Sequence, residues 1–121
     1  MPGILTVNVF DGEVNNKSDK NETIIAVICG DQVKEFKSKV EPGKNPEWKE
    51  TAEFKIVTES ESTVFFAVYS LDKNGVKTLG VAGQSLYHVS HDNAPEKSKI
   101  KLYNKDVEIG CLNFELIFKG L

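Results

Sequence analysis

The sequence predicts an all-β fold, an eight-stranded antiparallel Greek-key β-sandwich, and three observations support this prediction. First, the long apolar segments alternate between apolar and polar residues with a period of two, which is typical of strands. Second, polar stretches rich in Gly, Pro, Asn and Asp separate these segments. Third, the segments recur roughly every 10–15 residues, a spacing that favours a two-sheet sandwich over alternating strands and helices.

The first four strands are predicted from the apolar alternation and from the turns between them. Residues 4–10 alternate, and a polar loop follows them. Residues 23–29 form a nearly continuous β-branched run, and residues 34–40 place apolar side chains on one face and charged ones on the other. The fourth strand, 48–56, contains an irregular step around Lys49 to Thr51 that predicts a β-bulge.

The last four strands follow the same reasoning. Residues 64–69 are apolar on both faces, which predicts a strand in the centre of a sheet, whereas 79–89 is a weaker strand that two glycines interrupt. Residues 99–103 and 112–119 alternate strictly. Because no linker, repeat or change of composition is visible, we expect residues 1–121 to form one domain.

Composition excludes several classes of protein. The chain has 121 residues, 40% of them hydrophobic, and a net charge of −3, so neither disorder nor a strong attraction to nucleic acid is expected. All 15 basic residues are Lys, and no apolar run approaches the roughly 20 residues of a membrane span. No secretory signal is visible, so we expect a cytoplasmic location, with attachment to a membrane surface as a further option. The sequence leaves the oligomeric state open, and a monomer is assumed.

Nothing in the sequence indicates catalysis. Cys29 and Cys111 lie within apolar stretches without a neighbouring histidine, and they are interpreted as free thiols. No nucleophile elbow or glycine-rich phosphate loop is present. We therefore expect a protein that binds and does not catalyse.

One stretch resembles a known signature. Residues 45–50, Asn-Pro-Glu-Trp-Lys-Glu, followed by Phe54, are similar to the Asn-Pro-x-Trp-x-Glu-x-x-Phe signature of the C2 domain, with one additional residue expected around Thr51 and Ala52. Residues 3–9 resemble the first strand of that family. Residues 110–116 resemble the strand that other C2 domains carry first, which implies the circularly permuted type II topology.

The resemblance also identifies where a calcium site would lie. In C2 domains, two loops at one end of the sandwich supply about five Asp ligands, and calcium affinity follows their charge. Only Asp72 matches outright, and Lys77 or Thr78 occupies a later ligand position. The degenerate positions are Asn16, Asp19, Glu22, Ser70, Asp72 and Asn74. We therefore expect no cofactor, with weak calcium binding as an alternative.

Two sets of lysines are candidate sites for anionic phospholipids. Lys37 and Lys39 share one face of a strand, and Lys99 and Lys101 share a face of another, together with Lys97. The resemblance implies that the strand of Lys37 lies on the concave sheet that contacts lipid headgroups. The alternative is that these lysines only solvate strand faces and protect sheet edges.

Three functions remain open from the sequence. The first is a calcium-independent C2 module that binds anionic membrane surfaces, recruits partner proteins there, or does both. The second is a C2 fold used only for protein–protein interaction, and the third is a weak calcium-dependent phospholipid binder. Phe10, close to the first loop, is kept as an aromatic side chain that would dip into a membrane.

Overall fold

A computed structural model describes residues 2–15, 22–38, 45–57, 62–72, 74–87, 89 and 92–120, and the described residues contain strands and no helix. The strands are β1 (Gly3–Val14), β2 (Glu22–Cys29), β3 (Gln32–Lys37), β4 (Glu47–Ile56), β5 (Thr63–Asp72), β6 (Gly75–Ser85), β7 (Glu96–Asn104) and β8 (Val107–Gly120). All pairs of neighbouring strands are antiparallel. The predicted all-β fold is confirmed.

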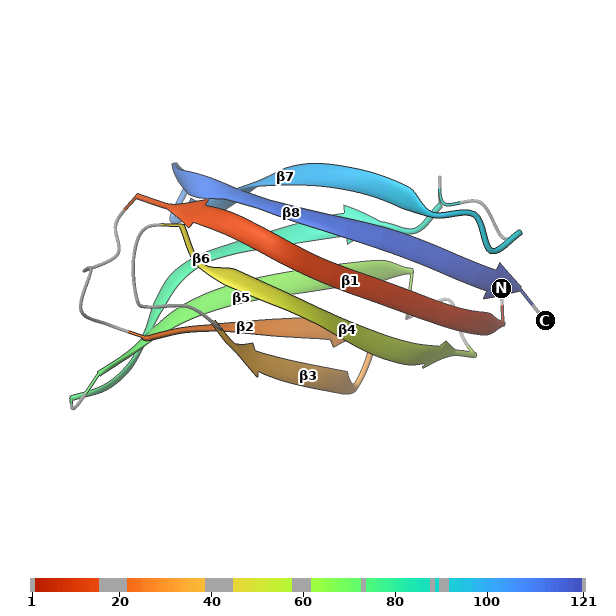
Figure 1. Cartoon of the computed structure of the whole chain (residues 1–121), viewed down its shortest axis with the longest axis horizontal. Coiled ribbons are helices and arrows are strands. Elements are labelled where there is room, and N and C mark those ends of the chain that lie inside the picture. Colours follow the sequence, from red (N-terminus) through yellow and green to blue (C-terminus); the bar gives the residue numbers. More distant parts are fainter. Residues whose placement is uncertain are drawn as a thin grey trace.

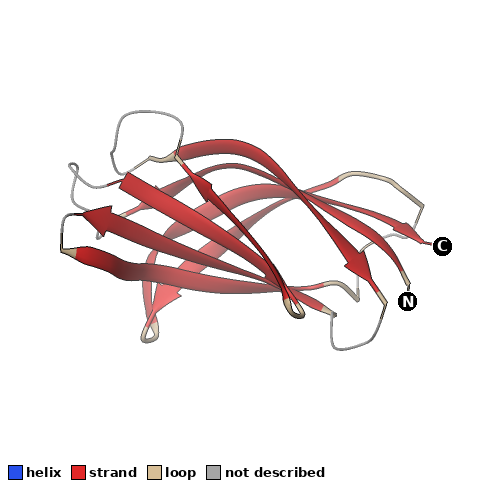
Figure 2. Cartoon of the chain, turned by 90° about the horizontal axis from the view of Figure 1, so that it is seen from below, coloured by secondary structure: helices blue, strands red, loops and turns tan. Residues whose placement is uncertain are grey.

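The strands form two packed layers (Figures 1 and 2). The first layer has the order β3-β2-β5-β6, and the second layer has the order β7-β8-β1-β4. One residue pair, Val81 with Tyr103, joins β6 to β7 and so connects the two layers along one side. Across the interior, the rings of Phe66 on β5 and Phe114 on β8 lie 4.7 Å apart.

The last strand lies where the permuted topology predicts it. β8 is inserted between β7 and β1, and it pairs with β1 from Gly3 opposite Gly120 to Val14 opposite Gly110. The two chain ends therefore lie together at one end of the sandwich, as Figure 1 shows.

The core is made by every second residue of the strands. In β1, Leu5, Val7 and Val9 are buried, and their neighbours in sequence are half-buried. Five aromatic residues of the strands are at most 1% exposed: Trp48, Phe54, Phe66, Phe114 and Phe118. Burial of such large apolar side chains is the main favourable contribution to folding.

The segment around the Asn-Pro-x-Trp signature is attached to β1. Gly12 donates its backbone N–H to the carbonyl of Pro46 at 3.0 Å. The Trp48 indole lies close to Gly12. A Cβ atom on Gly12 would be 3.3 Å from the indole and 2.9 Å from the Cys111 carbonyl. Glycine at position 12 therefore lets β1 pass close to the tryptophan.

The predicted bulge of β4 is present, and it lies between Glu47 and Glu50. Val9 pairs with Glu50, but Asp11 pairs with Glu47, so β4 contains one extra residue between these two pairs. Lys49 adopts a left-handed backbone with φ of 49°. Thr51 and Ala52, around which the additional residue of the signature is expected, pair in regular register with Asn8 and Val7 of β1.

On the side of the sandwich opposite β6 and β7, the side chain of Gln32 links the two layers. The Gln32 amide donates from Nε2 to the Lys55 carbonyl at 2.8 Å and accepts from the Lys55 N–H at 3.1 Å. Both partners belong to edge strands, β3 and β4, which lie in different layers. The Gln32 side chain thus reproduces the two hydrogen bonds of a ladder pair between strands that are not paired by their backbones.

Several strand boundaries differ from the sequence prediction. β1 extends to Val14 and β8 begins at Val107, whereas the predictions were 4–10 and 112–119, so residues 11–14 belong to a strand and not to the predicted polar loop. β6 begins at Gly75 and ends at Ser85, whereas the prediction was 79–89, because its first residues extend the hairpin with β5. β3 begins at Gln32, and the end of the predicted third strand, residues 39 and 40, lies outside the described residues.

Candidate functional site

The outer faces of the two layers differ in chemistry. On the first layer, most outward-facing side chains of the two central strands are apolar, including Ile24 and Ile28 on β2 and Phe65 and Tyr69 on β5, whereas Glu22 at the start of β2 is charged. We call this surface the apolar face. Its cross-strand rows are Val33–Ile28–Phe65–Gly83, Glu35–Ala26–Ala67–Val81, Lys37–Ile24–Tyr69–Thr78 and Glu22–Leu71–Val76.

Large apolar side chains of this face are open to solvent. Phe65 and Val33 are each 51% exposed, and Val81 is 48% exposed. Between them lie Ala26 and Ala67, which point outward but are only 3% and 6% exposed because larger neighbours surround them. The ring of Phe65 lies over Gly83, where a Cβ would meet it at 3.1 Å.

The outer face of the second layer is polar and hydrogen-bonded across its strands. Asn113 donates from Nδ2 to Asp11 Oδ1 at 2.6 Å. Farther along, Thr51 donates to Asn8 Oδ1 at 2.7 Å, and Asn8 donates in turn to Glu115 Oε1 at 2.9 Å. These bonds stabilise the face without covering a hydrophobic surface.

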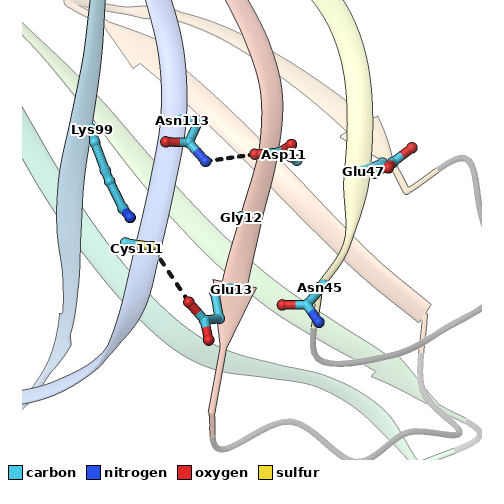
Figure 3. A pocket seen from close by; sticks show the side chains of 8 residues that line it. All are labelled: Asp11, Gly12, Glu13, Asn45, Glu47, Lys99, Cys111 and Asn113. Atoms are coloured by element: carbon cyan, nitrogen blue, oxygen red, sulfur yellow. Dashed lines mark hydrogen bonds between the residues drawn. The ribbon is translucent and has the colours of Figure 1, made fainter.

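A pocket of about 210 Å³ opens on this polar face (Figure 3). It is lined by Asp11, Gly12, Glu13, Asn45, Glu47, Lys99, Cys111 and Asn113. The Cys111 thiol points toward Glu13 Oε2 at 4.0 Å, which is the limit of a weak S–H hydrogen bond. Among the residues whose placement is described, no group of three or more His, Cys, Asp or Glu side chains is arranged to hold a metal ion. The pocket thus combines one amine with three carboxylates and offers ion-pair and hydrogen-bond partners.

The two sets of predicted lipid-binding lysines lie on different layers. Lys37 is exposed at the rim of the apolar face, and its Nζ lies 3.8 Å from a carboxylate oxygen of Glu22. Lys99 and Lys101 are exposed on β7 in the second layer, and Lys101 lies 3.3 Å from Glu108. Lys39 is outside the described residues. A single flat surface therefore cannot contact both sets at once.

Two of the degenerate calcium positions, Glu22 and Ser70, do not converge. Glu22 is exposed and forms an ion pair with Lys37, whereas Ser70 is 4% exposed and faces the interior. Asp72 pairs through its backbone with Gly75 at the β5–β6 turn, where Asn74 is exposed. Asn16 and Asp19 lie outside the described residues. Glu22 and Ser70 thus point to opposite sides of the first layer.

Phe10 does not lie at a loop tip. It is half-buried within β1, opposite the bulge of β4, and lines a pocket of about 300 Å³ with Asn8, Lys49, Glu50 and Thr51. This position is on the outer face of a sheet, four residues before β1 ends.

Sequence reasoning missed the apolar face, although its signal was visible. Residues 64–69 are apolar on both faces, a pattern interpreted as central placement, and residues 23–29 form a nearly continuous β-branched run. β5 and β2 are indeed internal to the first layer, but only one face of that layer is covered by the second. In an antiparallel sandwich the outer face is normally polar, so an apolar outer face is an exception that indicates contact with another molecule.

Comparisons with known proteins agree with the fold. The family model described as C2 domain matches residues 3–107. The first C2 domain (domain A) of plant Extended Synaptotagmin 1 has a TM-score of 0.83 and 22% identity over 100% of this chain and 98% of that chain. A structure of the two C2 domains, A and B, of Extended-Synaptotagmin 2 gives a TM-score of 0.77 and 18% identity over 97% of this chain and 41% of that one.

Human GIVD cytosolic phospholipase A2 gives a TM-score of 0.75 and 15% identity over 99% of this chain, but only 16% of that enzyme is covered. A search of curated proteins gives no significant match. Within the part of the chain that the structure describes, no helix is long and apolar enough to cross a bilayer. The family match, the permuted eight-stranded sandwich and the position of the Asn-Pro-x-Trp segment together show that this chain belongs to the C2 domain family.

Proposed function

We propose that this chain is a calcium-independent, non-catalytic C2 module that binds a partner protein through its apolar face. C2 domains generally bind membranes or proteins. The observation that carries the proposal is the half-exposed cluster of Phe65, Val33 and Val81 around two buried alanines on the first layer. Contiguous apolar patches of this kind are rare on monomeric proteins unless they bind something.

The charges around the apolar face favour a protein over an anionic membrane. An anionic bilayer attracts basic residues, each of which contributes about 1 kcal/mol when it lies close to the surface. The rows of the face contain Glu22 and Glu35 beside Lys37, and Glu22 already pairs with this lysine. These three described residues carry a net charge of −1, which opposes close contact with an anionic leaflet.

Calcium independence is supported by the described loop positions. A calcium site needs about six to eight oxygen ligands that converge on one point. Glu22 faces outward and Ser70 faces inward, so these two positions do not contribute to a common site.

A membrane-binding function is the second candidate, and one observation favours it. Lys97, Lys99 and Lys101 are all exposed on one face of β7. This face could contact anionic lipid in a salt-dependent manner, although Glu115, Asp11 and Glu13 share the same surface. In that case the Lys97→Glu, Lys99→Glu double variant would lose vesicle binding.

Two measurements test the proposal together. Wild-type protein is sedimented with vesicles containing phosphatidylserine, with and without about 0.1 mM calcium, and we expect it to remain in the supernatant in both cases. A photo-reactive benzoylphenylalanine is then placed at position 65, which is 51% exposed, or at the control position 107, which is 62% exposed, in cells that express the chain. We expect a specific cross-linked protein from position 65 only. Co-sedimentation with vesicles, or equal cross-linking from both positions, would contradict the proposal.

A further inference from the structure

We infer that the partner of the apolar face is a second copy of this chain, so that two first layers stack face to face in a two-fold symmetric dimer. This inference rests on the proposed function and specifies its partner. Its starting point is shape: the face is the outer side of a four-stranded sheet. Sheets pack on sheets about 10 Å apart with aligned strands, and a copy of the chain presents the same kind of surface.

The chemistry of the face matches that of a homodimer interface. Its two central strands present Ile24, Ile28, Phe65 and Tyr69 outward, and none of their outward residues between these positions is charged. Homodimer interfaces are more apolar than other interfaces, and charged residues are depleted from their centres. Transient protein interfaces, by contrast, are about as polar as the rest of the surface.

The size of the face is sufficient for a stable dimer. With strands about 4.8 Å apart and side-chain rows about 6.8 Å apart, four strands and four rows cover about 19 Å by 27 Å, or roughly 500 Å² in projection. Because side chains make the surface uneven, the accessible area is larger than this projection. Stable interfaces bury roughly 600–1,000 Å² on each partner, and the projected area of about 500 Å² lies just below this range before the unevenness of the surface is counted.

The charges at the rim are of both signs, which suits pairing with an identical surface. In a two-fold symmetric interface, every contact occurs twice: if one residue of the first copy contacts a second residue of the other copy, the same two residues also meet with the copies exchanged. A rim of one sign would repel its own copy, whereas Lys37 can meet Glu22 or Glu35 of the other chain. Lys37 and Glu22 are 67% and 56% exposed in their side chains, so their ion pair is open to rearrangement.

The test compares the mass of the full chain in solution with that of matched variants. Sedimentation velocity and light scattering at about 1–200 µM protein should show wild type approaching twice the chain mass of 13.4 kDa as concentration rises. Val33→Glu and Val81→Glu each place a charge in the face and should raise the dimer dissociation constant at least about 100-fold. Val107→Glu is the matched control, because Val107 is 62% exposed but lies at the β7–β8 turn.

Folding and salt dependence complete the design. Circular dichroism and thermal melting of each variant establish that a monomeric variant is folded, and only folded variants are compared. Because the contact is apolar, the wild-type dimer should persist at about 0.5 M salt, where charge attraction is screened within a few ångströms.

A wild type that stays monomeric up to about 200 µM, or a dimer that both face variants leave unchanged, overturns the pairing of two copies. In either case, cross-linking from position 65 to a different protein would still support the proposed function. Vesicle binding that Val33→Glu and Val81→Glu do not alter would overturn the proposed function as well.

Discussion

Removal of the Gln32 amide tests how the side of the sandwich between β3 and β4 is held. The amide makes hydrogen bonds of 2.8 Å and 3.1 Å with the backbone of Lys55, in the other layer. A hydrogen bond contributes about 1 kcal/mol net, and because these groups are exposed, water replaces part of that contribution when the amide is lost. Gln32→Ala should therefore lower the free energy of unfolding by about 1–2 kcal/mol. Gln32→Glu keeps the acceptor but turns a carboxylate oxygen toward the Lys55 carbonyl, so it should cost at least as much.

The assay is urea unfolding followed by the fluorescence of Trp48, the single tryptophan of the chain. With a slope of about 2 kcal/mol/M for a protein of this size, the midpoint should fall by roughly 0.5–1 M while the slope stays unchanged. Gln84→Ala is the control, because the Gln84 amide donates only to the adjacent Ser85 carbonyl, at 3.1 Å. If Gln32→Ala lowers the midpoint no more than Gln84→Ala does, the amide does not hold the two layers together.

Three further predictions concern the core, a glycine and calcium. Trp48→Ala removes a side chain that is 0% exposed and should cost about 3–5 kcal/mol in urea unfolding; a loss below about 1 kcal/mol would mean that the indole is not buried. Gly110→Ala should destabilise the fold strongly, because its Cβ would overlap the Glu13 carbonyl. Gly75→Ala should cost only backbone strain, because no atom lies within 4 Å of its Cβ. Equal melting temperatures of the two variants would refute the close approach of Gly110 to Glu13. Calcium at about 0.1 mM should leave the melting temperature unchanged, whereas a ligand that binds the folded state and is present at 100 times its dissociation constant would raise the free energy of unfolding by about 2.7 kcal/mol. An upward shift of the melting temperature that Asp72→Asn abolishes would reveal a working calcium site.

The strands and the core could be predicted from the sequence because both depend on local alternation. Each second residue of a strand points to the same side, so the alternation in residues 112–119 indicates which side chains share a face without knowledge of the layers. The place of β8 could be predicted only through the resemblance of residues 110–116 to a strand of known position. Alternation alone does not indicate which strands are neighbours.

The arrangement of the candidate sites could not be predicted, because it depends on pairing between distant segments. The spacing of Lys99 and Lys101 shows that they share a face, but not that this face and Lys37 belong to different layers. Likewise, the sequence shows that Phe65 lies on a strand apolar on both sides, but not that one side lacks a covering layer. The bulge at Lys49 depends on the register with β1, which the sequence of β4 alone does not determine.

The pairing of Gly3 with Gly120 has a consequence for how this domain can be connected to other segments. Paired residues of antiparallel strands have Cα atoms about 4.5–5.5 Å apart, so a short linker can join the two ends of the chain. The two-residue turn at Lys105 and Asp106, where φ is 49° and 69°, lies at the opposite end of the β7–β8 pair and offers a place for new ends. A chain joined at these ends and opened at this turn would begin with β8. Its strands would then follow the order of C2 domains that carry this strand first, and every strand would keep its neighbours in the sheet. Any domain joined to either end of this chain would therefore leave from the end of the sandwich opposite the β5–β6 and β7–β8 turns, and both turns would stay accessible.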